Sequence, residues 1–291
     1  MDHRKSLLFA HCAVFLLGFT ALMTDLSALS AEKIVLGRTA FAAPVLFLLI
    51  RHRAFYNRVC SASLKYKFLL PFTSVLLCAH WLCFFESIDQ GSVAIALLTL
   101  ACTPFFIIVL NCIAGIQKSF LKDFITCFII LLGIFVMVPK TFESNSMAWI
   151  LGLASAMLVA GFSFTNKLLI SKFESIELSM IQTGLCVPIL LMFVPYEAII
   201  GLTSEQWLYL AACGIVCTAL AQTLLLQSMK HLSALSASFI VNLEPVYGIL
   251  LAVLILGDQI PMNQWLGGSI VFLGVIFSSL PLRIRGQVVL S

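Results

Sequence analysis

The sequence predicts an all-α membrane protein of ten transmembrane helices, arranged as two inverted five-helix repeats. Three observations support this fold class. Of the 291 residues, 61% are hydrophobic and 10% are charged, whereas soluble domains carry about 25% charged residues. The hydrophobic residues form ten segments, each about as long as a membrane-crossing helix. The chain also resembles itself at an offset of 141 residues.

The composition excludes an ordinary soluble enzyme. The net charge is +4, and no basic stretch is interleaved with aromatic residues, so no nucleic-acid partner is expected. The ten cysteines lie within long apolar runs, where they are expected to pack as small hydrophobic residues. The Walker A, HExxH and GxSxG motifs are absent from the sequence. We therefore expect neither catalytic residues, nor a metal site, nor a cofactor.

The length of each apolar segment and the polar residues between segments define the predicted helices. A bilayer core of about 30 Å needs about 20 residues of α-helix, and charged, polar or Gly- and Pro-containing stretches interrupt the apolar pattern between segments. The first segment follows Arg4 and Lys5 as in a signal peptide, but a clear cleavage site is missing, so we expect it to be retained. The predicted helices span residues 6–24, 34–50, 68–86, 92–112, 121–138, 148–166, 178–198, 206–228, 233–256 and 264–282.

The distribution of charge predicts the orientation. With ten helices both termini lie on one side, and fourteen lysines and arginines fall in the loops of that side against two on the other. Cytoplasmic loops are enriched in Lys and Arg, so both termini are expected in the cytoplasm, with the chain in the inner (plasma) membrane of a bacterium. All loops are short except 51–67, which leaves no room for a nucleotide-binding domain.

The internal similarity divides the chain into a first repeat, residues 1–140, and a second, residues 146–284. Because each half has an odd number of helices, the second enters the membrane from the opposite face. Inverted repeats of this kind are typical of secondary transporters, whose substrate site lies near the midplane between the halves. The matched residues include Ser92 with Ser233, Pro104 with Pro245, and Gly133 with Gly274.

Short motifs in both halves carry a family resemblance. In the first half they are Arg38-Thr39-Ala40-Phe41 and Ser87-Ile88 with Ser92-Val93-Ala94, which leads to Thr103-Pro104. In the second half they are Asn242-Leu243-Glu244-Pro245-Val246, Leu256-Gly257-Asp258-Gln259 and Trp265-Leu266-Gly267-Gly268. Together they resemble the drug/metabolite transporter superfamily, in its ten-helix EamA-type branch. The resemblance implies a basket of ten helices, a central cavity lined mainly by helices 1, 3, 4, 6, 8 and 9, and transport of small metabolites, often export of amino acids.

Glu244 is the sharpest candidate for substrate binding or coupling. It lies about 11 residues into its helix and so near the bilayer centre, where a carboxylate costs about 2.5–3.5 kcal/mol. Binding a proton would remove that cost, and we expect no cation at the same depth. Protons are therefore the candidate coupling ion. The alternative is that Glu244 only supports the backbone beside Pro245.

Two prolines are candidate hinges. Pro104 and Pro245 each remove a backbone hydrogen bond near the middle of a predicted helix, at the carbonyls of Leu100 and Val241. Both helices are expected to kink there. The alternative to a hinge is a static kink that aids packing.

Other polar residues lie at similar depth. His80 and Trp81 could bind an aromatic or zwitterionic substrate, and Gln222 and Asn242 could bind it through their amides; each could instead only join helices. Arg38 is expected to snorkel to the outer interface, with contact to a substrate carboxylate as the alternative. Asn166 and Lys167 are expected to be solvated at the cytoplasmic edge, with a gate contact as the alternative.

The expected function is secondary active transport of a small metabolite, an amino acid or related compound, by alternating access and in the direction of export. Uptake or exchange of a cytosolic metabolite such as S-adenosylmethionine remains an alternative, and an intramembrane enzyme is an alternative of another class. The expected partners are the small-molecule substrate, the lipid bilayer and protons. The sequence leaves the oligomeric state open.

Overall fold

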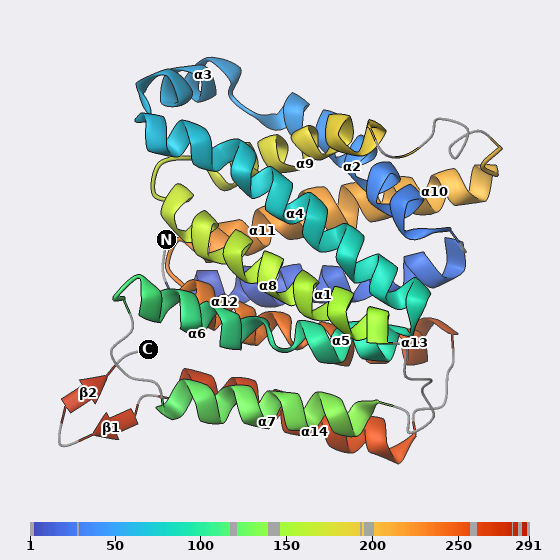
Figure 1. Cartoon of the computed structure of the whole chain (residues 1–291), viewed down its shortest axis with the longest axis vertical. Helices are drawn as coiled ribbons and strands as arrows, with labels where there is room; N and C mark the ends of the chain where they lie inside the picture. The colour runs from blue at the N-terminus through green and yellow to red at the C-terminus, as the bar shows by residue number, and fades with distance from the viewer. Residues whose placement is uncertain are drawn as a thin grey trace.

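The computed structural model describes residues 3–27, 29–116, 121–138, 146–192, 194, 201–256, 261–280, 282–284 and 287–289. These residues form one stack of helices that run side by side (Figure 1). The first part contains α1 (His3–Ser27), α2 (Ala31–Leu49), α3 (His52–Ser61), α4 (Leu64–Gln90), α5 (Val93–Leu100), α6 (Thr103–Ile113) and α7 (Leu121–Met137). The second contains α8 (Ser146–Leu169), α9 (Ser175–Leu191), α10 (Ser204–Ala212), the π-helix η2 (Cys213–Leu220), α11 (Ala221–Ser228), α12 (Ala234–Val241), α13 (Glu244–Leu256) and α14 (Met262–Ser279).

All ten predicted segments overlap helices, three of them helices that are interrupted or change type, and the end of the seventh segment, 195–198, lies outside the described residues. Five helical stretches of the described residues are long and apolar enough to cross a membrane, or six if the 96° bend between α2 and α3 lies within one span. The prediction of a mostly helical membrane protein is therefore confirmed. The number of spans and their inverted arrangement remain predictions.

Two local features differ from the expectation. After α14 the chain adds a short antiparallel pair, β1 (Leu282–Ile284) and β2 (Gln287–Val289), which joins Arg283 to Val288 in register. Both strands are rich in β-branched or apolar residues, and only two residues separate them, as in a hairpin. The basic connection 51–67 also contains a helix, α3, none of whose residues is buried.

The helix α3 is attached to the second half of the chain through Arg58. Its guanidinium donates to both carboxylate oxygens of Glu177 on α9, with the Nη2–Oε1 distance at 2.7 Å. Glu177 is buried, and its hydrogen bonds raise the pKa of Arg58. This ion pair joins the connection after α2 to the start of α9.

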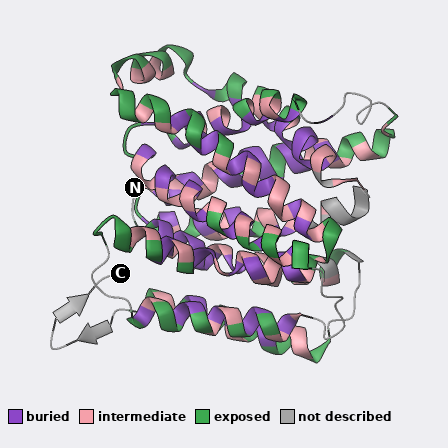
Figure 2. Cartoon of the chain, in the orientation of Figure 1, coloured by how far each residue is buried: buried purple, intermediate pink, exposed green. Residues whose placement is uncertain are grey.

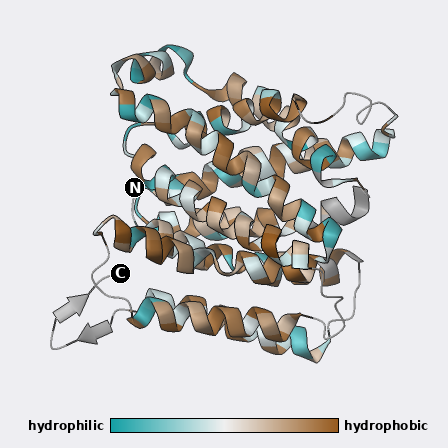
Figure 3. Ribbon diagram, viewed as in Figure 1, coloured by the Kyte–Doolittle hydropathy of each residue, from teal (hydrophilic) through white to brown (hydrophobic). Residues whose placement is uncertain are grey.

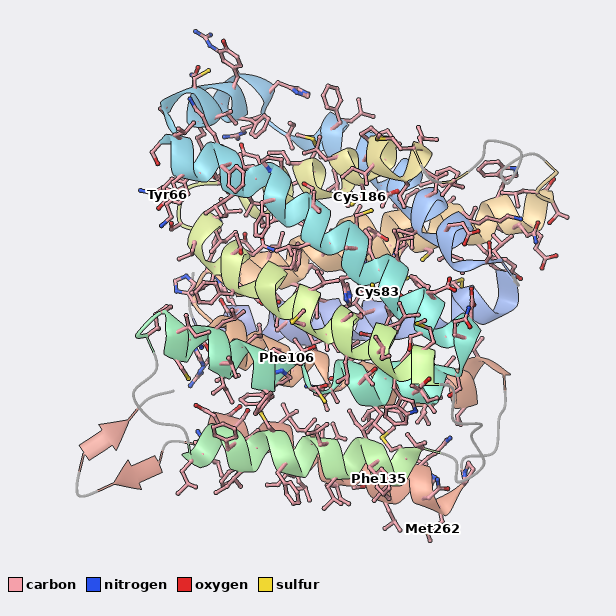
Figure 4. The ribbon with its side chains drawn as sticks, in the orientation of Figure 1. Tyr66, Cys83, Phe106, Phe135, Cys186 and Met262 are labelled. Carbon is pink, nitrogen blue, oxygen red and sulfur yellow. The ribbon has the colours of Figure 1, made fainter. Side chains whose placement is uncertain are left out.

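The outer surface is apolar, as expected for contact with lipid. Figures 2 and 3 show that exposed positions along α7 and α14 are largely hydrophobic. Phe135 on α7, labelled in Figure 4, is 61% exposed, and Phe128 on the same helix is 69% exposed. A soluble protein rarely exposes so continuous an apolar surface.

The helices α7 and α14 run antiparallel and support one another at both ends. Lys122 near the start of α7 donates to the carbonyls of Ser278 and Leu280, both at 2.6 Å, where α14 ends. Asn263 near the start of α14 donates to the carbonyls of Val136 and Met137, both at 3.3 Å, where α7 ends. Lys122 and Asn263 are matched by the offset of 141 residues, so the contact is repeated in the reverse direction.

The interruption of the fourth predicted helix is also repeated in the ninth. α5 and α12 begin after Ser92 and Ser233, and each serine hydroxyl accepts a hydrogen bond from the backbone amide three residues later. The second part of each helix then begins one residue before its proline, at Thr103 and at Glu244. Proline suits the first turn of a helix because the amide it lacks has no intrahelical partner there. The structure thus interrupts both helices directly before Pro104 and Pro245.

Gly133→Val is expected to destabilise the protein by separating α7 from α14. A Cβ atom at Gly133 would lie 2.7 Å from Val271 Cγ2 and 2.8 Å from its backbone nitrogen. Overpacking of this kind costs about 1–3 kcal/mol. Thermal denaturation of the purified protein should show a lower midpoint than for Gly184→Val, since a Cβ at Gly184 would meet no described atom within 4 Å apart from its neighbours and the backbone of its own helix. Equal midpoints for both variants would contradict the packing described.

Candidate substrate cavity

A cavity of about 140 Å³ lies among the central helices. It is lined by residues of α1, α4, α5, α6, α8, η2, α11, α12 and α13, which are the helices that the resemblance implies, and also by Arg38 of α2 and Ile134 of α7. The interruptions before Pro104 and Pro245 both reach it, since Thr103 and Glu244 line its wall. Freed backbone at membrane depth is tolerated where it is buried in protein or borders a cavity.

The structure brings together all five residues predicted to bind or couple. His80, Trp81, Gln222, Asn242 and Glu244 line the one cavity. Of the two predicted hinge residues, Pro245 lines it and Pro104 does not. Shared position makes these residues candidates, and their roles remain predictions.

Aromatic side chains make up much of the wall contributed by α4. Trp81, Phe84 and Phe85 border the cavity beside His80, and Phe162 of α8 borders it as well. The Nδ1 atom of His80 lies 2.8 Å from the hydroxyl and 3.1 Å from the carbonyl oxygen of Ser155. His80 therefore joins α4 to α8 while it lines the cavity.

A chain of buried amides extends from the cavity into the surrounding helices. Gln222 donates to Gln182 Oε1 at 2.9 Å, and Gln182 donates to Asn166 Oδ1 at 2.6 Å and to Thr73 Oγ1 at 3.2 Å. Asn166, Gln182 and Thr73 are fully buried. The network therefore fixes Gln222 through α9, α8 and α4.

The expected solvation of Asn166 and Lys167 is wrong. Asn166 points into the protein and pairs with Gln182, because a buried amide needs polar partners. Lys167 donates to the carbonyls of Met229 and Leu232, at 2.6 and 2.8 Å, in the turn between α11 and α12. These carbonyls lie at a helix end, where they lack an intrahelical donor, and the half-buried lysine supplies one to each.

The expected snorkelling of Arg38 is also wrong. Arg38 is 3% exposed and its side chain lines the cavity. Its Nε donates to Thr218 Oγ1 at 2.8 Å, and its guanidinium carbon lies 4.6 Å from the centre of the Trp81 ring. Depth along a helix does not say which face a side chain occupies, and the Trp81 ring and Thr218 hydroxyl make the inward direction favourable.

The carboxylate of Glu244 shares the cavity with this guanidinium. Glu244 has no hydrogen-bond partner among the described residues, and Arg38 is the cation that acts on it electrostatically. The expectation that no cation lies at the depth of Glu244 is therefore wrong. Among the described residues that line it, the cavity holds one carboxylate and one guanidinium, together with the His80 imidazole, neutral amides and aromatic rings.

The sequence interpretation missed Gln182 and Thr218, and it directed the Arg38 side chain to the outer membrane interface instead of the cavity. Gln182 was recognisable as an amide within an apolar helix, the signal that singled out Gln222. Thr218 had no such signal, because its role depends on the π-helix. In the described part of the chain, no three His, Cys, Asp or Glu side chains are grouped closely enough to hold a metal ion.

Comparisons with known proteins show similarity to membrane transporters. Residues 146–280 match the model of the EamA-like transporter family. The chain is 27% identical over 201 residues to the uncharacterized transporter YxxF of Bacillus subtilis, covering 67% of this chain and 64% of that protein. It thus spans slightly less than two thirds of that relative's length.

Other relatives align over about three quarters of each chain. The pseudopaline exporter CntI of Pseudomonas aeruginosa is 24% identical over 216 residues, and the uncharacterized inner membrane transporter YicL of Salmonella typhimurium is 27% identical over 230 residues. A solved crystal structure with 14% identity superposes with a TM-score of 0.76 over 96% of this chain and 97% of its own. That match concerns the fold alone.

Proposed function

Because this chain belongs to the drug/metabolite transporter superfamily, with an EamA-like transporter region and relatives named as transporters, we propose that it is a secondary carrier that works by alternating access. It is a multi-pass membrane protein, and its substrate is a small molecule. The cavity at the two equivalent helix interruptions is the observation that carries the proposal, because it places polar groups and broken backbone together in the protein interior.

The two halves of the carrier are inverted repeats, residues 1–140 and 146–284. Three pairs of features support this arrangement: the interruptions before Pro104 and Pro245, the serines that begin α5 and α12, and the reversed contacts of Lys122 and Asn263. If each half can adopt the conformation of the other, the cavity can open to either face of the membrane.

The direction that we propose is export of an amino acid or related compound. One relative is named as an exporter of pseudopaline, and the cavity combines charged groups with aromatic walls. Uptake or exchange of a cytosolic metabolite such as S-adenosylmethionine is the second candidate, because the same cycle runs in either direction. We propose no catalytic activity.

The carrier is placed in a bacterial inner membrane with both termini in the cytoplasm. The excess of Lys and Arg in the loops on the side of the termini supports this orientation. Proton coupling is proposed at Glu244, whose carboxylate lines the cavity and is free to bind a proton in one state and release it in another.

Counterflow in proteoliposomes tests the proposed function. Vesicles loaded with an unlabelled amino acid should transiently accumulate the same labelled compound from outside, because a carrier exchanges substrate across the membrane. A panel of the twenty L-amino acids and S-adenosylmethionine separates the two substrate proposals. Absence of counterflow with every compound would contradict transport of these classes.

Pro104→Ala and Pro245→Ala are expected to lower the turnover of transport about tenfold, while substrate affinity stays within about threefold. Each alanine restores a backbone donor and favours a continuous helix across the interruption, which stiffens the segment that must rearrange. Initial transport rates over a range of substrate concentrations separate the two parameters. Pro188→Ala, in α9 away from the cavity, is the control. Parental turnover in both variants would mean that the interruptions are static.

A further inference from the structure

Arg38 is a buried cation without an ion-pair partner in the described part of the chain. Its side chain is 3% exposed, and the recorded ion pairs involve Arg58 and Lys230 instead. An unpaired charge at membrane depth is costly, and such residues face a cavity or a substrate pathway. Arg38 lines the cavity, so its charge is presented to whatever occupies that space.

The π-helix η2 holds the guanidinium in place. Thr218 donates its hydroxyl proton to the carbonyl of Cys213 at 2.9 Å and accepts from Arg38 Nε at 2.8 Å. The carbonyl of Cys217 accepts from Nη2 at 3.4 Å. Gly214 lets α2 approach, since a Cβ there would lie 2.7 Å from the Arg38 carbonyl. π-helical turns occur frequently at functional sites.

These contacts leave part of the guanidinium unused. Arginine has five N–H donors, and the two recorded hydrogen bonds occupy two of them. The Trp81 ring covers the guanidinium at 4.6 Å and so restrains its plane. A planar group with free donors is suited to bind a carboxylate through two parallel hydrogen bonds.

The side-chain oxygen of Gln222, in the same cavity, needs a hydrogen-bond donor. Gln222 is 7% exposed and its Nε2 donates to Gln182, but its Oε1 is buried and has no hydrogen-bond partner among the described residues. A buried acceptor without a donor is destabilising. The carboxylate of Glu244 is a further acceptor on the wall, so the cavity also offers a place for a cationic donor such as an ammonium group.

We propose that Arg38 binds the carboxylate of the transported molecule, while Gln222 Oε1 and Glu244 receive its ammonium group. This inference rests on the proposed function and narrows it to zwitterions of the α-amino-acid type. The apolar part of the ligand would lie against Trp81, Phe84 and Phe162. Arg38 is then the residue that selects for the acid.

Matched ligands test the proposal on the unaltered protein. The purified chain is screened by thermal shift against the twenty L-amino acids, because binding to the folded state raises apparent stability. For each acid that stabilises the protein, the C-terminal amide and the des-amino acid are compared. Both analogues are expected to bind at least tenfold more weakly. An amide that binds as well as its acid, or an absence of stabilisation by every amino acid, would overturn the proposal.

Substitutions then locate the carboxylate contact. Arg38→Lys keeps the positive charge but loses the planar pair of N–H donors. It is expected to weaken binding of the acid at least tenfold, with little effect on binding of the amide. Arg53→Lys on the exposed face of α3 is the matched control. If Arg38→Lys does not fold, Thr218→Val serves instead, because it keeps the guanidinium and removes its anchor. Unchanged preference for the acid in the variant that folds would overturn the assignment.

Two further measurements distinguish binding of the amino acid's carboxylate from binding of inorganic anions, and the inference from the proposed function. Sodium chloride and sodium phosphate at equal ionic strength should not reproduce the stabilisation by the acid, and equal stabilisation by either salt would mean that Arg38 binds inorganic anions. Counterflow separates the inference from the function on which it rests. A compound that shows counterflow without a carboxylate would leave transport standing and remove the role of Arg38.

Discussion

Glu244→Gln is expected to abolish accumulation of substrate driven by a pH gradient, while substrate exchange persists with a raised KM, because the amide keeps an acceptor for the ammonium group but loses the negative charge. Thr103, at the equivalent position, donates its hydroxyl proton to the Leu100 carbonyl at 2.6 Å, the carbonyl that Pro104 deprives of its backbone donor. Glu244 can do the same for Val241 only when protonated, because a carboxylate has no proton to donate. Gln donates permanently and keeps an acceptor oxygen for the ligand.

The measurement compares net uptake under an imposed pH gradient with exchange at equal pH, in proteoliposomes and with the compound identified by counterflow. Glu205→Gln, on the exposed part of α10, is the control and should retain both activities. If Glu244→Gln continued to concentrate substrate in response to the gradient, Glu244 would not be the coupling group. Support of the interruption at Pro245 would then be its role.

Gln182→Leu is expected to lower both stability and transport, because it breaks the network that holds Gln222. The change removes three hydrogen bonds and leaves Gln222 Nε2 and Asn166 Oδ1 unpaired, while the Thr73 hydroxyl keeps its bond to the Leu70 carbonyl. Hydrogen bonds between membrane helices average about 0.6 kcal/mol, and each buried group left unpaired adds about 1–3 kcal/mol, so a loss of about 2–4 kcal/mol is expected. Transport should fall at least tenfold, since the Gln222 amide is then free to turn away from the cavity.

Thermal denaturation and initial rates of counterflow measure the two effects. Gln264→Leu on α14 is the matched control, because Gln264 lies outside the network and outside the cavity. A Gln182→Leu protein with parental stability and transport would show that the amide network neither supports the fold nor positions Gln222.

The features that depend on chain length and local chemistry could be predicted from the sequence. The apolar segments became helices because a bilayer-length run without charge has few alternatives. The interruptions at Pro104 and Pro245 followed from the missing backbone donor. Position along the predicted helix identified five residues near the bilayer centre, because the thickness of the membrane fixes where the middle of a spanning helix lies. These residues are His80, Trp81, Gln222, Asn242 and Glu244.

The features that depend on the direction of a side chain could not be predicted. Arg38 is close enough to the end of α2 to reach the interface, and only its packing against Trp81 and Thr218 turns it inward. Lys167 similarly depends on where the turn after α11 places two free carbonyls. A single sequence gives the spacing of residues along a helix but not the neighbouring helix that each face meets.

The central claim is that one cavity opens alternately to the two sides of the membrane. Ser163 lines the cavity and is not among the residues that we propose to bind substrate, so Ser163→Cys in an otherwise cysteine-free protein reports access to it. A protein that retains only the native Cys60, exposed on α3, is the control and should react from one side only.

The decisive measurement is the rate at which a membrane-impermeant thiol reagent labels Cys at position 163 from each face of oriented vesicles, with and without substrate. Alternating access predicts labelling from both faces, with substrate changing the two rates in opposite directions or protecting the thiol from both. Labelling from a single face under every condition would contradict the account.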